Sequence, residues 1–306
     1  MQPNDWWKSA VFYQIYLRSF YDSNNDGIGD LKGVIEKLDH LNDGNGGGLG
    51  IDAIWLSPFY PSPQADFGYD VSDYCDVDPI FGSLKDFDSL VSESHKRQIS
   101  VVIDLVLNHT SDQHPWFAES RQNRTNDKAD WYVWVDPDPD GNPPNNWLAV
   151  FGGAAWTYDL QREQYYLHNF LPEQPDLNWY NPEVRESLAE VIRFWINRGV
   201  DGFRLDTANY YAFDRQLRDN PKRPDGSEIL EDGQEVNPLS AYITKYSKDR
   251  PENLEFIKFL RKIFDEKEHI TSIGEIGSGE GLDSTLRLSA DYVKRKDGLH
   301  LAYTFA

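Results

Sequence analysis

The stretch Gly199-Val-Asp-Gly-Phe-Arg-Leu-Asp206 decides the fold that we predict for this chain. A glycine ends the helical pattern that precedes it, a short apolar strand follows, and a carboxylate stands at the end of the strand. In a barrel of parallel strands, catalytic groups lie at the C-terminal ends of the strands. Asp206 is therefore the first candidate for a catalytic carboxylate. Arg204, two positions earlier, points to the same face of the strand.

Apolar runs and helical patterns alternate on both sides of this stretch. The other predicted strands are residues 10–17, 51–56, 101–107, 270–275 and 299–305, and helices are predicted at 31–41, after Ser83, after Asn181 and from Leu254. This alternation is typical of a parallel α/β protein. An open Rossmann sheet is the alternative, but no glycine fingerprint follows the first strand. Polar residues recur at successive strand ends, which favours a TIM (β/α)8 barrel.

The sequence is predicted to divide into three parts. Residues 1–109 form the first part of the barrel, residues 110–175 form a loop-rich domain B inserted after strand 3, and residues 176–306 continue the barrel. A closed barrel has eight strands, and six are predicted, so we expect the chain to end after strand 6. An unclosed barrel exposes two sheet edges. We therefore expect these residues alone to be unstable or inactive.

Composition excludes several classes of partner. The chain of 306 residues carries 51 acidic and 30 basic residues, a formal charge of −21, which opposes binding to nucleic acid or to an anionic membrane. Cys75 is the only cysteine, so no intrachain disulfide is possible. The N-terminus lacks a secretion signal and no long apolar run occurs, which predicts a soluble cytoplasmic protein.

Three strand ends carry carboxylates: Asp104, Asp206 and Glu275. Two carboxylates from different strands are what glycoside hydrolysis requires, because one attacks the anomeric carbon and the other protonates the leaving oxygen. Arg204 could keep Asp206 ionised. The alternative is a structural ion pair between Arg204 and Asp206, with Glu275 merely solvated at the rim of the barrel.

A second motif, Asp22-Ser-Asn-Asn-Asp-Gly-Ile-Gly-Asp30, matches the start of a calcium-binding loop, with alternate oxygen ligands and a glycine at the sixth position. One backbone carbonyl, that of Ile28, is a candidate ligand. The other four candidate ligands are side-chain oxygens, those of Asp22, Asn24, Asp26 and Asp30. A calcium hand would have a glutamate at Gly33, and its flanks would both be helices, so this is no calcium-hand domain. The alternative is a metal-free loop of Asx turns.

Several motifs together resemble one known family. Asp104-Leu-Val-Leu-Asn-His109, Gly202-Phe-Arg-Leu-Asp206 and Ile273-Gly-Glu275 resemble, in order, three signature regions of glycoside hydrolase family 13, the α-amylase family. Gln174-Pro-Asp-Leu-Asn178 and Asp66-Phe-Gly-Tyr69 resemble segments of its oligo-1,6-glucosidase and α-glucosidase branch. The resemblance covers essentially the whole chain and is closest to bacterial α-glucosidases (maltases).

The resemblance implies roles for individual residues. Asp206 would be the nucleophile and Glu275 the general acid/base. The residues that would bind substrate are Asp66, Tyr69, His109, Phe151, Phe170, Arg204 and Thr207. Asp104 and Asn108 are expected to support the site through hydrogen bonds. The branch binds a structural Ca²⁺ or Mg²⁺ at the loop from Asp22 to Asp30, and no organic cofactor is implied.

The implied function is a retaining α-glucosidase that releases terminal non-reducing α-1,4-linked glucose from maltose and short oligosaccharides, with possible transglucosylation. Thr207 indicates the linkage, since in similar enzymes threonine or alanine here accompanies α-1,4 activity and valine accompanies α-1,6 activity. The alternatives are a sucrose isomerase, a trehalose synthase and an oligo-1,6-glucosidase.

A non-catalytic alternative is the ectodomain of an amino-acid-transporter heavy chain. That class needs an N-terminal membrane helix and usually lacks an intact catalytic set, whereas this chain has Asp206 and Glu275. The fourth family signature, a His-Asp pair expected on the seventh strand, is absent from these residues. Turnover of maltose by the purified 306-residue chain would contradict the expectation that it is inactive alone.

Overall fold

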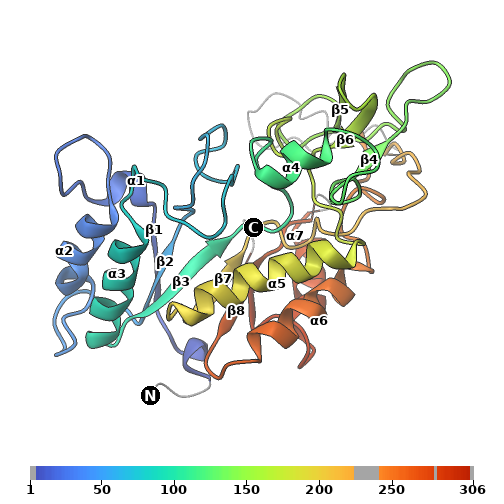
Figure 1. Cartoon of the computed structure of the whole chain (residues 1–306). Helices are drawn as coiled ribbons and strands as arrows, with labels where there is room; N and C mark the ends of the chain where they lie inside the picture. Colours follow the sequence, from blue (N-terminus) through green and yellow to red (C-terminus); the bar gives the residue numbers. More distant parts are fainter. Residues whose placement is uncertain (1–4, 224–240, 279–280, 304–306) are drawn as a thin grey trace.

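Six parallel strands form the main sheet of the computed structural model, which describes residues 5–223, 241–278 and 281–303. In the sheet the strands follow their order along the chain, as the sequence predicts (Figure 1). They are β1 (Phe12–Ile15), β2 (Ala53–Leu56), β3 (Ser100–Leu105), β7 (Gly202–Leu205), β8 (Thr271–Glu275) and β9 (Leu301–Tyr303). Every neighbouring pair is parallel. Within the described residues, β1 and β9 are the edges of this sheet.

Helices connect these strands, and local sequence signals set where they begin. The helices are α1 (Leu17–Phe20), α2 (Leu31–Leu41), α3 (Leu84–Lys96), α5 (Pro182–Asn197), α6 (Asn253–Phe264) and α7 (Leu282–Val293), and a 3-10 turn, η1 (Trp6–Lys8), precedes β1. Ser83 and Asp86 form a reciprocal capping box at the start of α3. Asn181 caps α5, and Pro182 occupies its first turn, where a missing N–H costs nothing.

Several elements differ from the sequence prediction. The third strand ends at Leu105 and not at residue 107, and the end of the predicted strand 299–305 lies outside the described residues. The first strand covers only Phe12–Ile15, because Leu17 already begins α1. The helix α7 was not predicted, because among its described side chains only Thr285 and Tyr292 are buried, so it lacks a continuous apolar stripe.

The segment between β3 and α5 forms a small sheet of its own, at the top right of Figure 1. Its elements are α4 (Pro115–Ser120), β4 (Trp134–Val135), β5 (Trp156–Asp159) and β6 (Gln164–Leu167), with β6 paired antiparallel to both β4 and β5. Trp147 and Trp156 belong to an apolar cluster separate from the main core. The sequence indicated a loop-rich insertion here. Its boundaries as a domain remain a prediction.

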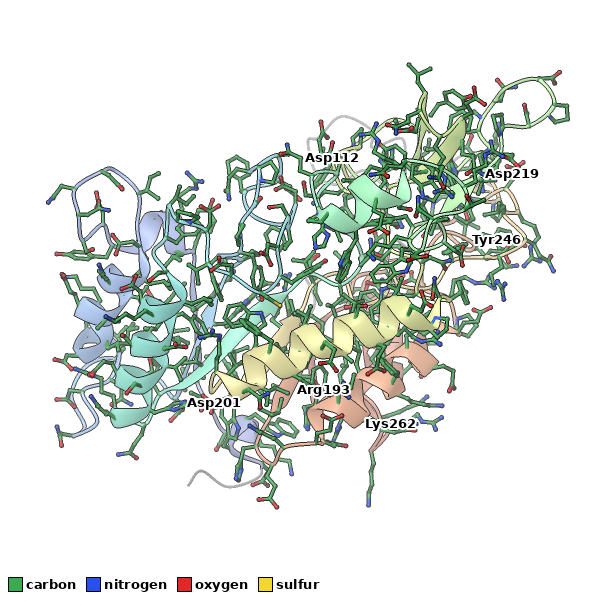
Figure 2. All side chains as sticks on the ribbon, in the orientation of Figure 1. Asp112, Arg193, Asp201, Asp219, Tyr246 and Lys262 are labelled. Atoms are coloured by element: carbon green, nitrogen blue, oxygen red, sulfur yellow. The ribbon has the colours of Figure 1, made fainter. Side chains whose placement is uncertain are left out.

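Arg193, which Figure 2 labels on α5, joins this helix to Glu266 just after α6. Arg193 on α5 donates to both carboxylate oxygens of Glu266, at 2.9 and 2.7 Å. It also contacts Glu186 and Glu190 on its own helix. The opposite face of α5 is apolar and buries Leu188, Ile192 and Trp195 in the main apolar core. This two-sided pattern is what the helical spacing in the sequence predicts.

Gly202 allows β7 and β8 to approach each other closely. A Cβ atom at Gly202 would lie 2.4 Å from Thr271 Cγ2 and 2.9 Å from the Thr271 carbonyl oxygen. The second atom belongs to the backbone of β8, so it cannot move without disturbing the pairing of the two strands. Position 202 therefore has no room for a side chain. It lies where β7 and β8, the strands that lead to Asp206 and Glu275, begin to pair.

We expect Gly202→Ala to lower the free energy of unfolding by about 1–3 kcal/mol, the usual cost of overpacking a buried site. Gly277→Ala is the matched control, because a Cβ atom there would have no neighbour within 4 Å. Urea denaturation of both variants measures the difference. Equal stability of the two variants would contradict the steric role of Gly202.

Candidate active site

The parallel register brings the candidate carboxylates to one end of the sheet. Asp104 on β3 lies beside Arg204 on β7, and Leu205 lies beside Gly274 on β8. The next position along each of these two strands holds Asp206 and Glu275. Residues separated by more than 170 positions in sequence therefore meet at the carboxyl ends of three adjacent strands.

Arg204 joins all three carboxylates. Its Nη1 atom donates to Asp104 Oδ1 at 2.6 Å and to Asp206 Oδ1 at 2.8 Å, and its Nη2 atom donates to Glu275 Oε2 at 2.5 Å. The Arg204 residue is only 3% exposed, so water screens these interactions weakly. The structural ion pair between Arg204 and Asp206 that the sequence left open is present, and it also includes Glu275.

One guanidinium cannot neutralise three carboxylates, and the electrostatics reflect this excess of negative charge. Burial, reinforced by the charge of Asp206 and opposed by Arg204, raises the pKa of Glu275 to about 7. Burial likewise raises the pKa of Asp104 to about 6, against the attraction of Arg204. The site therefore favours a protonated Glu275 near neutral pH, which is the state that a proton donor needs.

Thr207 bridges the two candidate catalytic carboxylates. Its backbone N–H donates to Glu275 Oε2 at 3.1 Å, and its hydroxyl donates to Asp206 Oδ2 at 3.1 Å. The φ angle of Thr207 is +41°, a conformation that is strained for a β-branched residue. Such strain is held in place only when the surrounding structure over-determines it.

Asp66 and His109 meet through a residue of a third motif, Gln174. The Gln174 amide donates to Asp66 Oδ2 at 2.9 Å, and its nitrogen lies 3.0 Å from His109 Nε2. Burial lowers the pKa of His109, which favours a neutral imidazole. Tyr69 completes this wall by donating to Asp104 Oδ2 at 3.2 Å. The buried side chain of Asn108 donates to Asp176 Oδ1 at 3.1 Å.

Aromatic rings line the outer part of the same region. Phe170 packs against His109 and Tyr210, with ring centroids 5.2 Å apart in each pair. Phe151 lies 6.0 Å from Phe170 and is 59% exposed, so it stands at the rim. The structure thus connects every candidate catalytic and substrate-binding residue, directly or through one neighbour.

Tyr303 was not singled out from the sequence, although it contacts the central arginine. Its hydroxyl accepts hydrogen bonds from Arg204 Nε at 3.0 Å and Nη2 at 2.7 Å. The same Nη2 atom binds Glu275, so Tyr303 and Glu275 share one donor. The only available signal was the position of Tyr303 near the end of a predicted strand.

A second group missed from the sequence ties the loop after β7 to the loop after β8. The Gly277 carbonyl accepts from Asn209 Nδ2 at 2.9 Å and from Lys248 Nζ at 3.0 Å. Lys248 is buried, and its ammonium lies 5.0 Å from the centre of the Tyr210 ring. Because Asn209 and Gly277 closely follow Asp206 and Glu275, this group fixes the spacing between the two strand ends. Nothing in the pattern around Lys248 indicated this role.

Comparison with known proteins places this arrangement in a family. The profile of the α-amylase catalytic domain matches residues 14–306. The chain belongs to the α-amylase family. A probable α-glucosidase of Rhizobium meliloti (strain 1021) is 56% identical over all 306 residues, which cover 54% of that protein. An oligo-1,6-glucosidase of Parageobacillus thermoglucosidasius is 47% identical over 88% of this chain and 45% of its own length.

Solved structures of the α-amylase family agree with this assignment. The α-glucosyl transfer enzyme XgtA superimposes with a TM-score of 0.91 at 52% identity, over 98% of this chain and 54% of that one. The trehalulose synthase MutB from Pseudomonas mesoacidophila MX-45 gives a TM-score of 0.84 at 41% identity, over 98% and 50% of the two chains. The chain thus spans about half the length of the relatives that it matches.

The predicted metal loop of this family member is a run of Asx turns. Asp22 accepts from the backbone N–H of Asn24, Asn24 from that of Asp26, and Asp26 from that of Ile28. Asp30 turns toward Ser23 and Gly33 and caps α2.

The donors in this loop are all oxygens, the ligand type that Ca²⁺ and Mg²⁺ prefer, so the chemistry of the set fits such an ion. No three acidic, histidine or cysteine side chains in the described parts of the chain converge into a metal cluster. The candidate ligands remain the side chains of Asp22, Asn24, Asp26 and Asp30 and the Ile28 carbonyl, and in this structure oxygens of all four side chains accept backbone N–H groups.

None of the helices in residues 5–223, 241–278 and 281–303 is both long and apolar enough to cross a lipid bilayer.

Proposed function

We propose that the protein containing this chain is a retaining α-glucosidase that removes terminal non-reducing α-1,4-linked glucose from maltose and short oligosaccharides. The single observation that carries the proposal is the Arg204 guanidinium between Asp206 and Glu275 at adjacent strand ends. In that arrangement Asp206 can act as the nucleophile and Glu275 as the acid, the pair that glycoside hydrolysis needs.

In the proposed reaction, an Asp206 carboxylate oxygen attacks the anomeric carbon while the glycosidic C–O bond breaks. Glu275 gives its proton to the leaving oxygen, and a covalent glucosyl ester on Asp206 results. Water then attacks the same carbon as Glu275 takes its proton, which frees Asp206. Two inversions at one carbon retain the anomeric configuration.

The remaining candidates would bind the non-reducing glucose. Asp66 and His109, linked by Gln174, would accept and donate hydrogen bonds to its hydroxyl groups, while Tyr69, Phe151 and Phe170 would cover its faces. We place the activity in the cytoplasm; these 306 residues, with the single cysteine Cys75, need no intrachain disulfide and so no oxidising compartment.

Transglucosylation is the second candidate, favoured by the similarity to the α-glucosyl transfer enzyme XgtA and to a trehalulose synthase. It shares the glucosyl ester with hydrolysis and differs in the acceptor, which is a sugar hydroxyl in place of water. Product analysis on maltose and on sucrose separates the two.

In a protein that carries this chain at the length of its relatives, we expect maltose to release glucose as the α-anomer. Asp206→Ala should reduce kcat/KM by on the order of 10³-fold or more, because the nucleophile is lost. Proton NMR of the first product identifies the anomer. Initial release of the β-anomer, or an active Asp206→Ala variant, would exclude the proposed mechanism.

The raised pKa of Glu275 predicts the alkaline limit of activity. Glu275 must be protonated to act as an acid, and it loses its proton as pH rises through about 7. We therefore expect kcat/KM on maltose to fall by roughly tenfold per pH unit above that value. A pH profile from about 4 to 9 tests this. A limit near the ordinary glutamate pKa of about 4.3 would contradict it.

The Thr207 hydroxyl predicts the effect of changing the linkage residue. Thr207→Val keeps the shape of the side chain but removes the hydrogen bond to Asp206. We expect the ratio of isomaltose to maltose hydrolysis to rise by roughly fivefold, a change on the scale of one hydrogen bond. Thr207→Ser, which keeps the hydroxyl, is the control. Comparable rates on both sugars before any substitution would refute the α-1,4 preference.

We also propose that the loop from Asp22 to Asp30 binds Ca²⁺ or Mg²⁺ and stabilises the fold without entering the reaction. Removing the ion with a chelator should lower the melting temperature, and adding it at 100 times its Kd should restore about 2.7 kcal/mol. Asp26→Ala should abolish this response. Asp43→Ala is the control, because Asp43 makes similar backbone contacts in another loop. An unchanged melting temperature with either ion would reject the site.

A further inference from the structure

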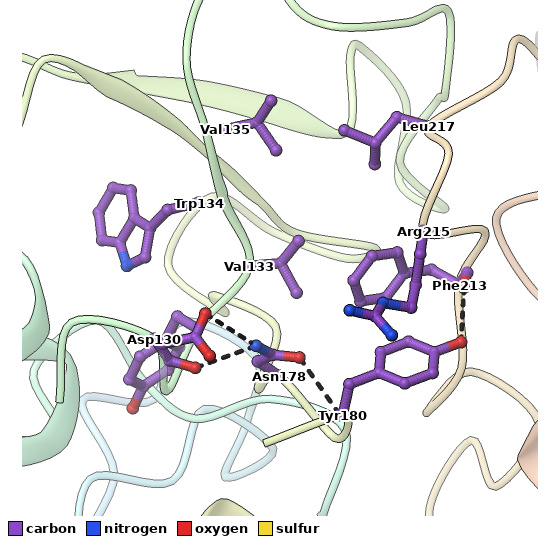
Figure 3. A pocket seen from close by; sticks show the side chains of 10 residues that line it. Asp130, Val133, Trp134, Val135, Asn178, Tyr180, Phe213, Arg215 and Leu217 are labelled. Atoms are coloured by element: carbon purple, nitrogen blue, oxygen red, sulfur yellow. Dashed lines mark hydrogen bonds between the residues drawn. The ribbon is translucent and has the colours of Figure 1, made fainter. Parts of the chain in front are cut away.

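A second pocket lies outside the carboxylate site, between β4, Tyr180 just before α5, and residues 213–217 after β7 (Figure 3). Its volume is about 320 Å³, at the lower end of the range for small-molecule sites. Its lining includes none of the residues to which we assign catalysis or substrate binding. The apolar part of the wall comes from Val133, Trp134, Val135, Phe213 and Leu217.

The walls of this pocket are held rigidly by contacts behind them. The Tyr180 ring meets Phe213 and Phe256 edge-on, at centroid distances of 5.2 and 5.4 Å, and its hydroxyl donates to the Phe213 carbonyl at 2.7 Å. Asn178 donates to the backbone carbonyl and the carboxylate of Asp130, at 3.0 and 3.1 Å. A ligand would therefore meet a preformed surface, which reduces the entropic cost of binding.

Two charged groups at this pocket have unused bonding capacity. The Arg215 guanidinium lies 5.1 Å from the centre of the Tyr180 ring, and within the described residues it makes no hydrogen bond or ion pair. Its five N–H donors can therefore receive a ligand. Asp130 is exposed, and its Oδ2 atom has no partner in the described part of the chain. Figure 3 shows the two groups on different sides of the pocket.

The opposite charges of these groups restrict the ligand. An anion would be repelled by Asp130 and by the overall charge of −21, and a cation would be repelled by Arg215. A neutral ring that carries hydroxyl groups can bind both side chains, because a hydroxyl accepts a hydrogen bond from Arg215 and donates one to Asp130. We propose that this pocket is a non-catalytic binding site for a neutral sugar ring. The sugar class follows the proposed function, but the site does not depend on the roles of Asp206 and Glu275.

The test uses maltose as the probe and saturation-transfer NMR as the measurement. A background variant with Asp66→Ala and Asp206→Ala removes hydrolysis and weakens binding at the catalytic site. We expect maltose binding to persist in this background. Adding Arg215→Ala or Asp130→Ala should raise the apparent Kd for maltose at least fivefold. The matched control is Arg287→Ala, an exposed arginine on α7, which should leave binding unchanged.

Loss of all maltose binding in the background variant would overturn the proposal. So would binding that neither Arg215→Ala nor Asp130→Ala reduces while the circular dichroism melts match. Inorganic phosphate that displaces maltose would overturn the assignment to a neutral ligand. These results concern binding in a variant that does not hydrolyse maltose. Maltose hydrolysis by the unmodified protein is measured separately, so this proposal and the proposed function can fail independently.

Discussion

The site depends on one buried guanidinium that faces three carboxylates. Arg204 lies near the carboxyl end of β7 and contacts Asp104, Asp206 and Glu275, and because it is buried, water screens little of its charge. Without the cation, three acids on adjacent strand ends would repel one another, and losing one partner of a buried pair typically costs about 3–5 kcal/mol. The same contacts therefore hold three strands together and set the protonation of the site.

The motif Gln174-Pro-Asp-Leu-Asn178 connects the inserted segment to this centre. Gln174 reaches Asp66 and His109, while Asp176 is buried between Asn108 and Asn169, where burial raises its pKa to about 8. Asn178 instead supports the separate pocket through Asp130. One short segment thus contributes to the catalytic region and to the proposed sugar site, because its side chains leave the backbone in different directions.

Most of the fold could be predicted from local patterns. The helix that follows the capping pair Ser83 and Asp86 and the start of α5 at Pro182 follow from signals within a few residues, and the alternation of strands and helices indicates the parallel sheet. The prediction failed where such signals are weak. The helix α7 buries little apolar surface, and α1 is a single turn that begins inside an apolar run. Tertiary contacts decide both.

The sequence by itself determined the family motifs, the residues that stand at each strand end and the excess of acid over base. These follow from residue identity and spacing alone. Only the tertiary structure decided that Arg204 is shared by three acids and by Tyr303, that the strained Thr207 bridges two of them, and that Lys248 clamps Gly277. Hydrogen bonds and charge interactions depend on distances between atoms, and Asp104, Glu275 and Tyr303 lie far from Arg204 along the chain.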